Sequence, residues 1–150
     1  MTNSSRCLGN MEVRKLSNYI SPYAEQIQEQ LNSLYPGVYE RISAISALPL
    51  SVGLSILVTL LELACQGQHT GMIVLARQRI AKIPSEWLLQ QLPKAISESL
   101  SLEDEWEYRR LLELLRDVAP QLLTGYIEQG LESEDADIRE AAEDFLPKNC

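Results

Sequence analysis

Few side chains in this 150-residue sequence are of the types that perform catalysis or bind metals. The single histidine, His69, lies in a polar turn, and one histidine is too few for a usual zinc site. Cys7, Cys65 and Cys150 are scattered, which predicts neither a Cys-x-x-Cys site nor a disulfide framework. Glycine motifs that bind phosphates or hold a nucleophilic serine are missing. We therefore expect a solvated His69, a buried Cys65, no catalytic or metal-binding residues and no cofactor.

The clearest candidate for recognition chemistry is the segment that begins at Glu105 and ends at Arg110. Tyr108 belongs to an apolar stripe with helical spacing, whereas Trp106 and Arg110 fall away from that stripe and are predicted to be exposed. Tryptophan and arginine are frequent anchors of protein interfaces. Glu105, Trp106 and Arg110 are therefore predicted to contact a partner, while core packing is the preferred interpretation for Trp87.

The charge of the chain is concentrated in its C-terminal half. The formal net charge is −8, with −1 over residues 1–75 and −7 over residues 76–150. This balance argues against general binding of nucleic acid, which requires a basic surface. Glu134 and Asp135, in an acidic turn, are predicted to help attract a basic protein partner. The alternative is that these acids form the polar outer face of a terminal repeat.

The distribution of apolar residues predicts an all-α fold. Turn residues recur along the chain, and the segments between them carry apolar side chains at steps of three and four. The chain also has 25 leucines and one phenylalanine, a composition that favours helices over strands. We expect about seven or eight helices. The stripe is clearest over residues 23–34, 108–118, 122–127 and 138–146.

Two segments need separate treatment. Residues 42–61 carry no charge over a length that could span a bilayer, but Pro49 and several polar residues argue against a membrane helix. Residues 51–60 also alternate as a strand would, yet no second alternating segment exists to pair with them. We therefore expect two helices that meet at Pro49, the second of them central in the core.

A later helix is expected to kink or split at Pro93.

The C-terminal half is internally similar. Tyr108–Glu113 (YRRLLE) and Ile138–Glu143 (IREAAE) match at an offset of 30 residues, and acidic residues precede both. Ile73–Ile80 is a looser third copy. Helical segments that recur at a fixed period are typical of a solenoid.

The stretch Leu131–Leu146 resembles the first helix of a HEAT repeat together with the turn that leads into it. The offset of 30 is similar to that of short bacterial HEAT-like repeats, and the likeness is good over 131–146, fair over 101–130 and weak over 69–99. The resemblance implies an α-α superhelix. In such an array Asp135 or Asp137 is expected to cap a helix, and Arg109 and Arg139 are expected to pair with acidic turns and hold the repeats in register.

Together these observations predict one helical domain over residues 1–150. Residues 1–10 are expected to be poorly ordered, 11–68 to form irregular helices and 69–150 to form the HEAT-like repeats. The predicted function is a cytoplasmic, non-catalytic scaffold that binds a protein partner. The alternative, implied by the resemblance alone, is a chromophore carrier or chaperone related to the phycobilisome lyases. The leucine excess leaves a homodimer open.

Overall fold

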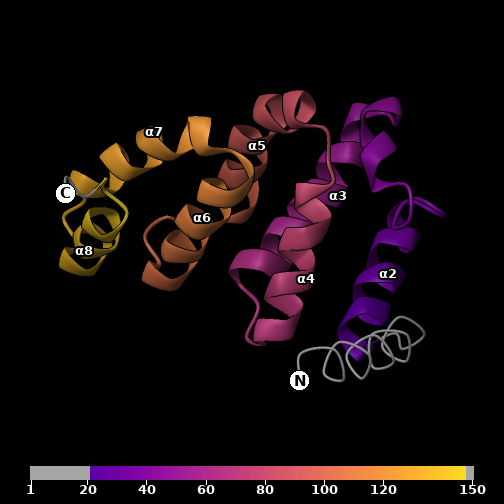
Figure 1. Cartoon of the computed structure of the whole chain (residues 1–150), viewed down its shortest axis with the longest axis horizontal. Coiled ribbons are helices and arrows are strands. Elements are labelled where there is room, and N and C mark those ends of the chain that lie inside the picture. Colours follow the sequence, from indigo (N-terminus) through magenta and orange to yellow (C-terminus); the bar gives the residue numbers. More distant parts are fainter. Residues whose placement is uncertain (1–20, 148–150) are drawn as a thin grey trace, which may run out of the picture.

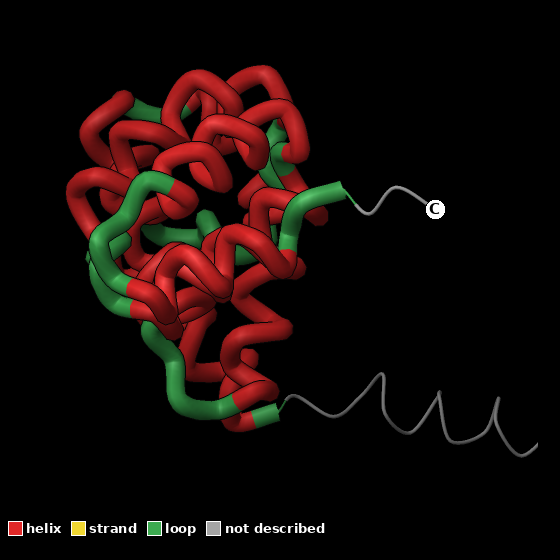
Figure 2. The backbone as a smooth tube through the Cα atoms, turned by 90° about the vertical axis from the view of Figure 1, so that its left-hand side faces the viewer, coloured by secondary structure: helices red, strands yellow, loops and turns green. Residues whose placement is uncertain are grey.

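The computed structural model describes residues 21–147, and every element in that range is helical (Figures 1 and 2). The all-α prediction is therefore confirmed for this part of the chain, whereas the predictions for residues 1–10, Cys7 and Cys150 lie outside it. The elements are α2 (Pro22–Leu34), η1 (Ile42–Ala47, a 3₁₀-helix), α3 (Leu50–Cys65), α4 (Thr70–Ala81), α5 (Ser85–Ser99), α6 (Glu105–Val118), α7 (Pro120–Leu131) and α8 (Ala136–Asp144).

The helices follow one another across the molecule from α2 to α8 (Figure 1). Helices α2, α4, α6 and α8 contact one another in turn, while α3 packs on α4, α5 and α6. The three similar segments found in the sequence fall on α4, α6 and α8. Equivalent sequence is thus found on helices that lie side by side.

Helix α3 is the centre of the main core, as its sequence predicts. It begins directly after Pro49 and is helical throughout, so the strand interpretation of residues 51–60 is wrong. Its side chains at Ile56, Leu57 and Leu60 are fully buried. Within residues 21–147, no helix combines the length and the apolar composition that crossing a bilayer requires.

Pro93 does not split its helix. Helix α5 continues from Ser85 through Pro93 to Ser99, so of the two expected outcomes, a kink or a split, the split does not occur. Pro93 is exposed, and the carbonyl that loses its N–H donor therefore lies on a side of the helix that water can reach. The break at Pro49 is confirmed, although the segment before it is a 3₁₀-helix and not an α-helix.

A second, smaller cluster joins α6, α7 and α8. Its centre is Tyr108, which is 1% exposed and packs with Ile138, Ala141 and Ala142. The small alanines allow close packing of the helices. The approach is closest at Gly130 of α7, which lies against Tyr108 and Ala142. A Cβ atom at Gly130 would overlap the Tyr108 hydroxyl and would lie 2.9 Å from the Ala142 Cβ.

Candidate functional site

The first turn of α6 is capped by the acidic residue that precedes it. Asp104 precedes the helix, and its carboxylate accepts a hydrogen bond of 3.0 Å from the backbone N–H of Glu107. Such a cap satisfies a donor that would otherwise be unpaired, and negative charge suits the positive end of the helix dipole. Asp104 therefore holds the beginning of α6, and with it Trp106, in a defined position.

Trp106 lies on the outside of this turn. The side chain is 64% exposed, more than any other large hydrophobic residue in residues 21–147, so its predicted exposure is confirmed. The guanidinium carbon of Arg110 lies 5.9 Å from the centre of the indole ring, within the range of a cation–π contact. A tryptophan held beside an arginine on a rigid helix offers a large apolar surface at little cost in conformational entropy.

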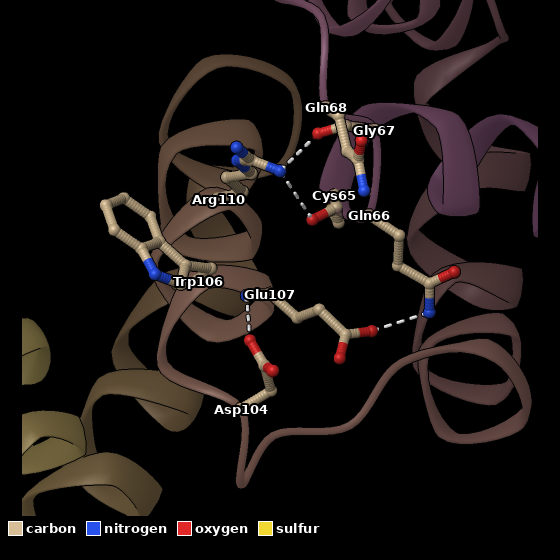
Figure 3. Close-up of a pocket in the computed structure, with 8 residues that line it drawn as sticks. All are labelled: Cys65, Gln66, Gly67, Gln68, Asp104, Trp106, Glu107 and Arg110. Atoms are coloured by element: carbon tan, nitrogen blue, oxygen red, sulfur yellow. Dashed lines mark hydrogen bonds between the residues drawn. The ribbon is translucent and has the colours of Figure 1, made fainter.

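Arg110 is half-buried, and it binds the neighbouring turn instead of standing free in solvent (Figure 3). Its Nη1 donates to the backbone carbonyls of Cys65, at 3.3 Å, and Gly67. These carbonyls lie at the C-terminal end of α3, where a positive charge is favourable. Arg110 thus joins α6 to the α3–α4 turn. It is only half-exposed and not exposed as predicted, because the apolar stripe of α6 does not reveal that this turn packs against it.

A second link lies below Arg110 in the same view. The Gln66 side-chain amide donates to the Glu107 carboxylate at 2.5 Å (Figure 3). The same amide donates to the Ser99 carbonyl at 2.9 Å. Arg110 and Gln66 border an open hollow of about 510 Å³ with Trp106 at its edge. The hollow is lined by Cys65, Gln66, Gly67, Gln68, Asp104, Trp106, Glu107 and Arg110.

The remaining predicted partner-binding residues lie elsewhere. Glu134 and Asp135 line a different hollow, of about 550 Å³, which also contacts Tyr108 of α6. Glu105 lines neither hollow, and its carboxylate lies 3.6 Å from the guanidinium of Arg109. The structure therefore brings Trp106 and Arg110 together, and Glu134 and Asp135 together, but it does not join all five residues in one site.

The predicted ladder residues make bonds of three different kinds. Arg109 donates to the Asp144 carboxylate of α8 at 2.7 Å, and this hydrogen bond raises the pKa of the guanidinium above its usual value. Asp135 caps α8, accepting from Asp137 N at 2.8 Å and Ile138 N at 3.4 Å. Arg139 donates to the backbone carbonyl of Ser133 at 2.7 Å, not to an acidic side chain as expected. Of the three predicted ladder residues, Arg109 alone therefore forms an ion pair with another of the described helices.

The sequence did not single out a second ion pair between these helices. Arg77 of α4 and Glu113 of α6 approach to 2.6 Å. No local pattern marked them, because the pair is separated by 36 residues and depends on how α4 packs on α6. Arg79 is a comparable case, since it stacks 4.4 Å from the centre of the Tyr39 ring and donates to the Tyr39 carbonyl.

Cys65 and His69 lie where the sequence predicts. Cys65 is a buried free thiol, and burial raises its pKa from 9.0 to about 12, so the thiol stays protonated well into the alkaline range. His69 is exposed just before α4, with its ring 5.7 Å from that of Tyr23. Among the described residues, no three His, Cys, Asp or Glu side chains are grouped as metal ligands would be.

Comparison of the chain with protein-family models, with curated proteins and with solved structures finds no match. The geometry is therefore the basis for any functional conclusion. It offers an exposed indole, two hollows with carboxylate-bearing linings, and helices fixed in position by side-chain hydrogen bonds. Such an arrangement suits non-covalent recognition of another molecule.

Proposed function

We propose that this chain is a cytoplasmic, non-catalytic protein-interaction module whose helices form a short HEAT-like superhelix. The three similar segments lie on α4, α6 and α8, and these helices contact one another in order, which is the arrangement that stacked repeats require. An odd number of scattered cysteines fits a reducing compartment. The module's binding surface is the beginning of α6.

The exposure of Trp106 is the observation that carries this proposal. Burying an aromatic side chain is strongly favourable. An indole that is 64% exposed on a well-packed helix therefore offers apolar area that a partner can bury. Its neighbours in the hollow already bind one another, Arg110 to the α3–α4 turn and Gln66 to Glu107. The platform is therefore formed before a partner arrives, which reduces the entropic cost of binding.

The partner is proposed to be a basic protein. The formal charge of the chain is −8, and most of it lies in the half that contains α6 and α8. A field of this sign accelerates encounter with a basic surface and disfavours acidic partners. The contact is then completed by apolar groups that cover Trp106.

Affinity capture from a lysate of the source cell tests the proposal when the bait is compared with two variants. Trp106→Ala is expected to abolish capture of a stoichiometric protein, because it removes the apolar anchor. Val74→Ala is the matched control, since Val74 of α4 is also exposed, at 44%, but lies outside both hollows. Equal capture by all three baits would contradict the proposal. A copurifying pigment without any Trp106-dependent protein would favour the chromophore carrier instead.

A further inference from the structure

The hollow between α6 and the α7–α8 turn combines two kinds of surface. Leu102, Tyr108 and Ile138 line it with apolar groups, and the carboxylates of Glu103, Glu134 and Asp135 line it with negative charge. The other lining residues are Gln129, Gly130 and Ser133. Its volume of about 550 Å³ lies in the range of sites that enclose a ligand. We name it the α6–α8 cleft.

The negative charge of this cleft is not neutralised within the described part of the chain. No arginine, lysine or histidine of residues 21–147 lies within 4.0 Å of the three carboxylates, and the lining contains no basic residue. Arg139 follows Ile138 in the sequence, but it donates to the Ser133 carbonyl. The two capping bonds of Asp135 both use Oδ1, which leaves Oδ2 for another donor.

We infer that the α6–α8 cleft receives an arginine side chain from the basic protein partner. This inference rests on the proposed function and names what the partner inserts. An arginine has an apolar stem that fits against Leu102 and Ile138, and its planar head carries five N–H donors. The several carboxylate acceptors that border the cleft match that fork better than they match the compact ammonium of lysine.

A short synthetic peptide tests the cleft without knowledge of the natural partner. The probe is acetyl-(Gly-Arg)₃-amide, titrated into the full ¹⁵N-labelled chain while the amide resonances are followed. The matched peptide contains citrulline, which keeps the shape of arginine but lacks its charge. The arginine peptide is expected to shift the amides of Gly130, Ser133 and Ile138 and the citrulline peptide to leave them in place. The corresponding lysine peptide is expected to bind more weakly.

Two double variants with the same change in net charge separate a local site from diffuse attraction. Glu103→Gln with Glu134→Gln removes two carboxylates of the cleft, and the Kd for the arginine peptide is expected to rise by about tenfold or more. Glu128→Gln with Glu140→Gln removes two exposed carboxylates of α7 and α8 that do not line the cleft. This control is expected to change the Kd by less than about twofold, because only screened surface charges are lost.

Equal weakening by the two double variants, or equal shifts with the citrulline peptide, would overturn the inference. Its failure can be distinguished from failure of the proposed function. Capture of a protein that depends on Trp106 but not on Glu103 and Glu134 would leave the interaction module standing and remove the arginine site. Peptide binding in the cleft, together with capture that does not depend on Trp106, would leave the arginine site standing and remove the proposed binding surface at Trp106.

Discussion

The two hydrophobic clusters of the molecule are packed by different means. The larger one, from α2 to α6, consists mainly of leucine and isoleucine side chains around α3, and its stability comes from the volume that they fill. The smaller one, between α6 and α8, contains a tyrosine, two alanines and the close approach of Gly130. It is supplemented by polar bonds: Tyr108 to the Tyr126 carbonyl at 2.7 Å, and Arg109 to Asp144.

This difference indicates how each region responds to change. A cluster of large aliphatic side chains opens only when much of the domain opens, because several helices share the apolar area that it buries. A small cluster with few buried side chains has less apolar area to lose and relies on the fit of particular atoms. We therefore expect α7 and α8 to open at a lower free energy than the helices around α3.

The largest expected effect is a truncation in the larger cluster. Leu57→Ala removes a fully buried side chain of α3 and leaves a cavity, at a cost of about 2–5 kcal/mol. The free energy of unfolding, measured by urea denaturation with far-UV circular dichroism, is expected to fall by that amount in one cooperative transition. If Leu57→Ala destabilised only α7 and α8, the two clusters would not be divided as described.

Alkaline pH distinguishes the clusters through one buried acid in each. Burial raises the pKa of Cys65 from 9.0 to about 12, and it raises the pKa of Tyr108 from 10.0 to about 12. Above pH 9 the unfolded chain loses the Cys65 proton while the folded chain keeps it, so the free energy of unfolding falls as pH rises towards 12. The slope is about 1.4 kcal/mol per pH unit for one fully differing proton.

The Cys65→Ala variant shows how much of this pH dependence of the free energy of unfolding comes from the larger cluster. In this variant the fall is expected to begin near pH 10 and not pH 9, because only the tyrosine contribution remains. Denaturation curves between pH 8 and pH 11 measure it. An unchanged profile would mean that the thiol is not buried in the folded state.

The smaller cluster is tested by adding a single methyl group. In Gly130→Ala the new Cβ would overlap the Tyr108 hydroxyl, and the strain is expected to cost about 1–3 kcal/mol. Tyr108→Phe in the same chain removes the hydroxyl oxygen and should recover part of that loss, which a double-mutant cycle quantifies. Strictly additive effects of the two substitutions would contradict this contact.

The smallest effect on stability in this comparison is expected at the cap of α8. Asp135→Ala removes the acceptor for two backbone N–H groups and should cost about 0.5–2 kcal/mol. Hydrogen exchange is the suitable measurement, because the amides of α8 should lose protection while those of α3 keep it. Equal loss of protection in α3 would show that the smaller cluster does not open separately.

Local chemistry in the sequence was sufficient for much of the fold and for part of the site. Apolar spacing located the helices, Pro49 located a helix start, and the acidic turn before α8 limited its cap to Asp135 or Asp137. The exposure of Trp106 also followed from its place on the helix, because an isolated helical stripe fixes which side chains face away from the core.

The contacts that complete the site depend on packing between distant segments. Arg110 reaches carbonyls more than forty residues earlier, and Arg77 reaches Glu113 on another helix. No periodicity encodes such pairs, since they arise only when two helices are placed side by side. Helix α5 does not split at Pro93, one of the two outcomes expected there, because a local rule for proline does not include the exposure of that helix surface.

The central claim is that Trp106 is an exposed anchor for a protein partner. Its most direct test is the affinity of the captured partner for the Trp106→Ala variant, measured together with the stability of that variant. Because the indole is exposed, the free energy of unfolding should stay within about 0.5 kcal/mol of the parent chain. The loss of a binding hot spot should nevertheless raise the Kd measured by calorimetry by about thirtyfold or more. An unchanged Kd, or a loss of binding matched by a loss of stability, would contradict the account.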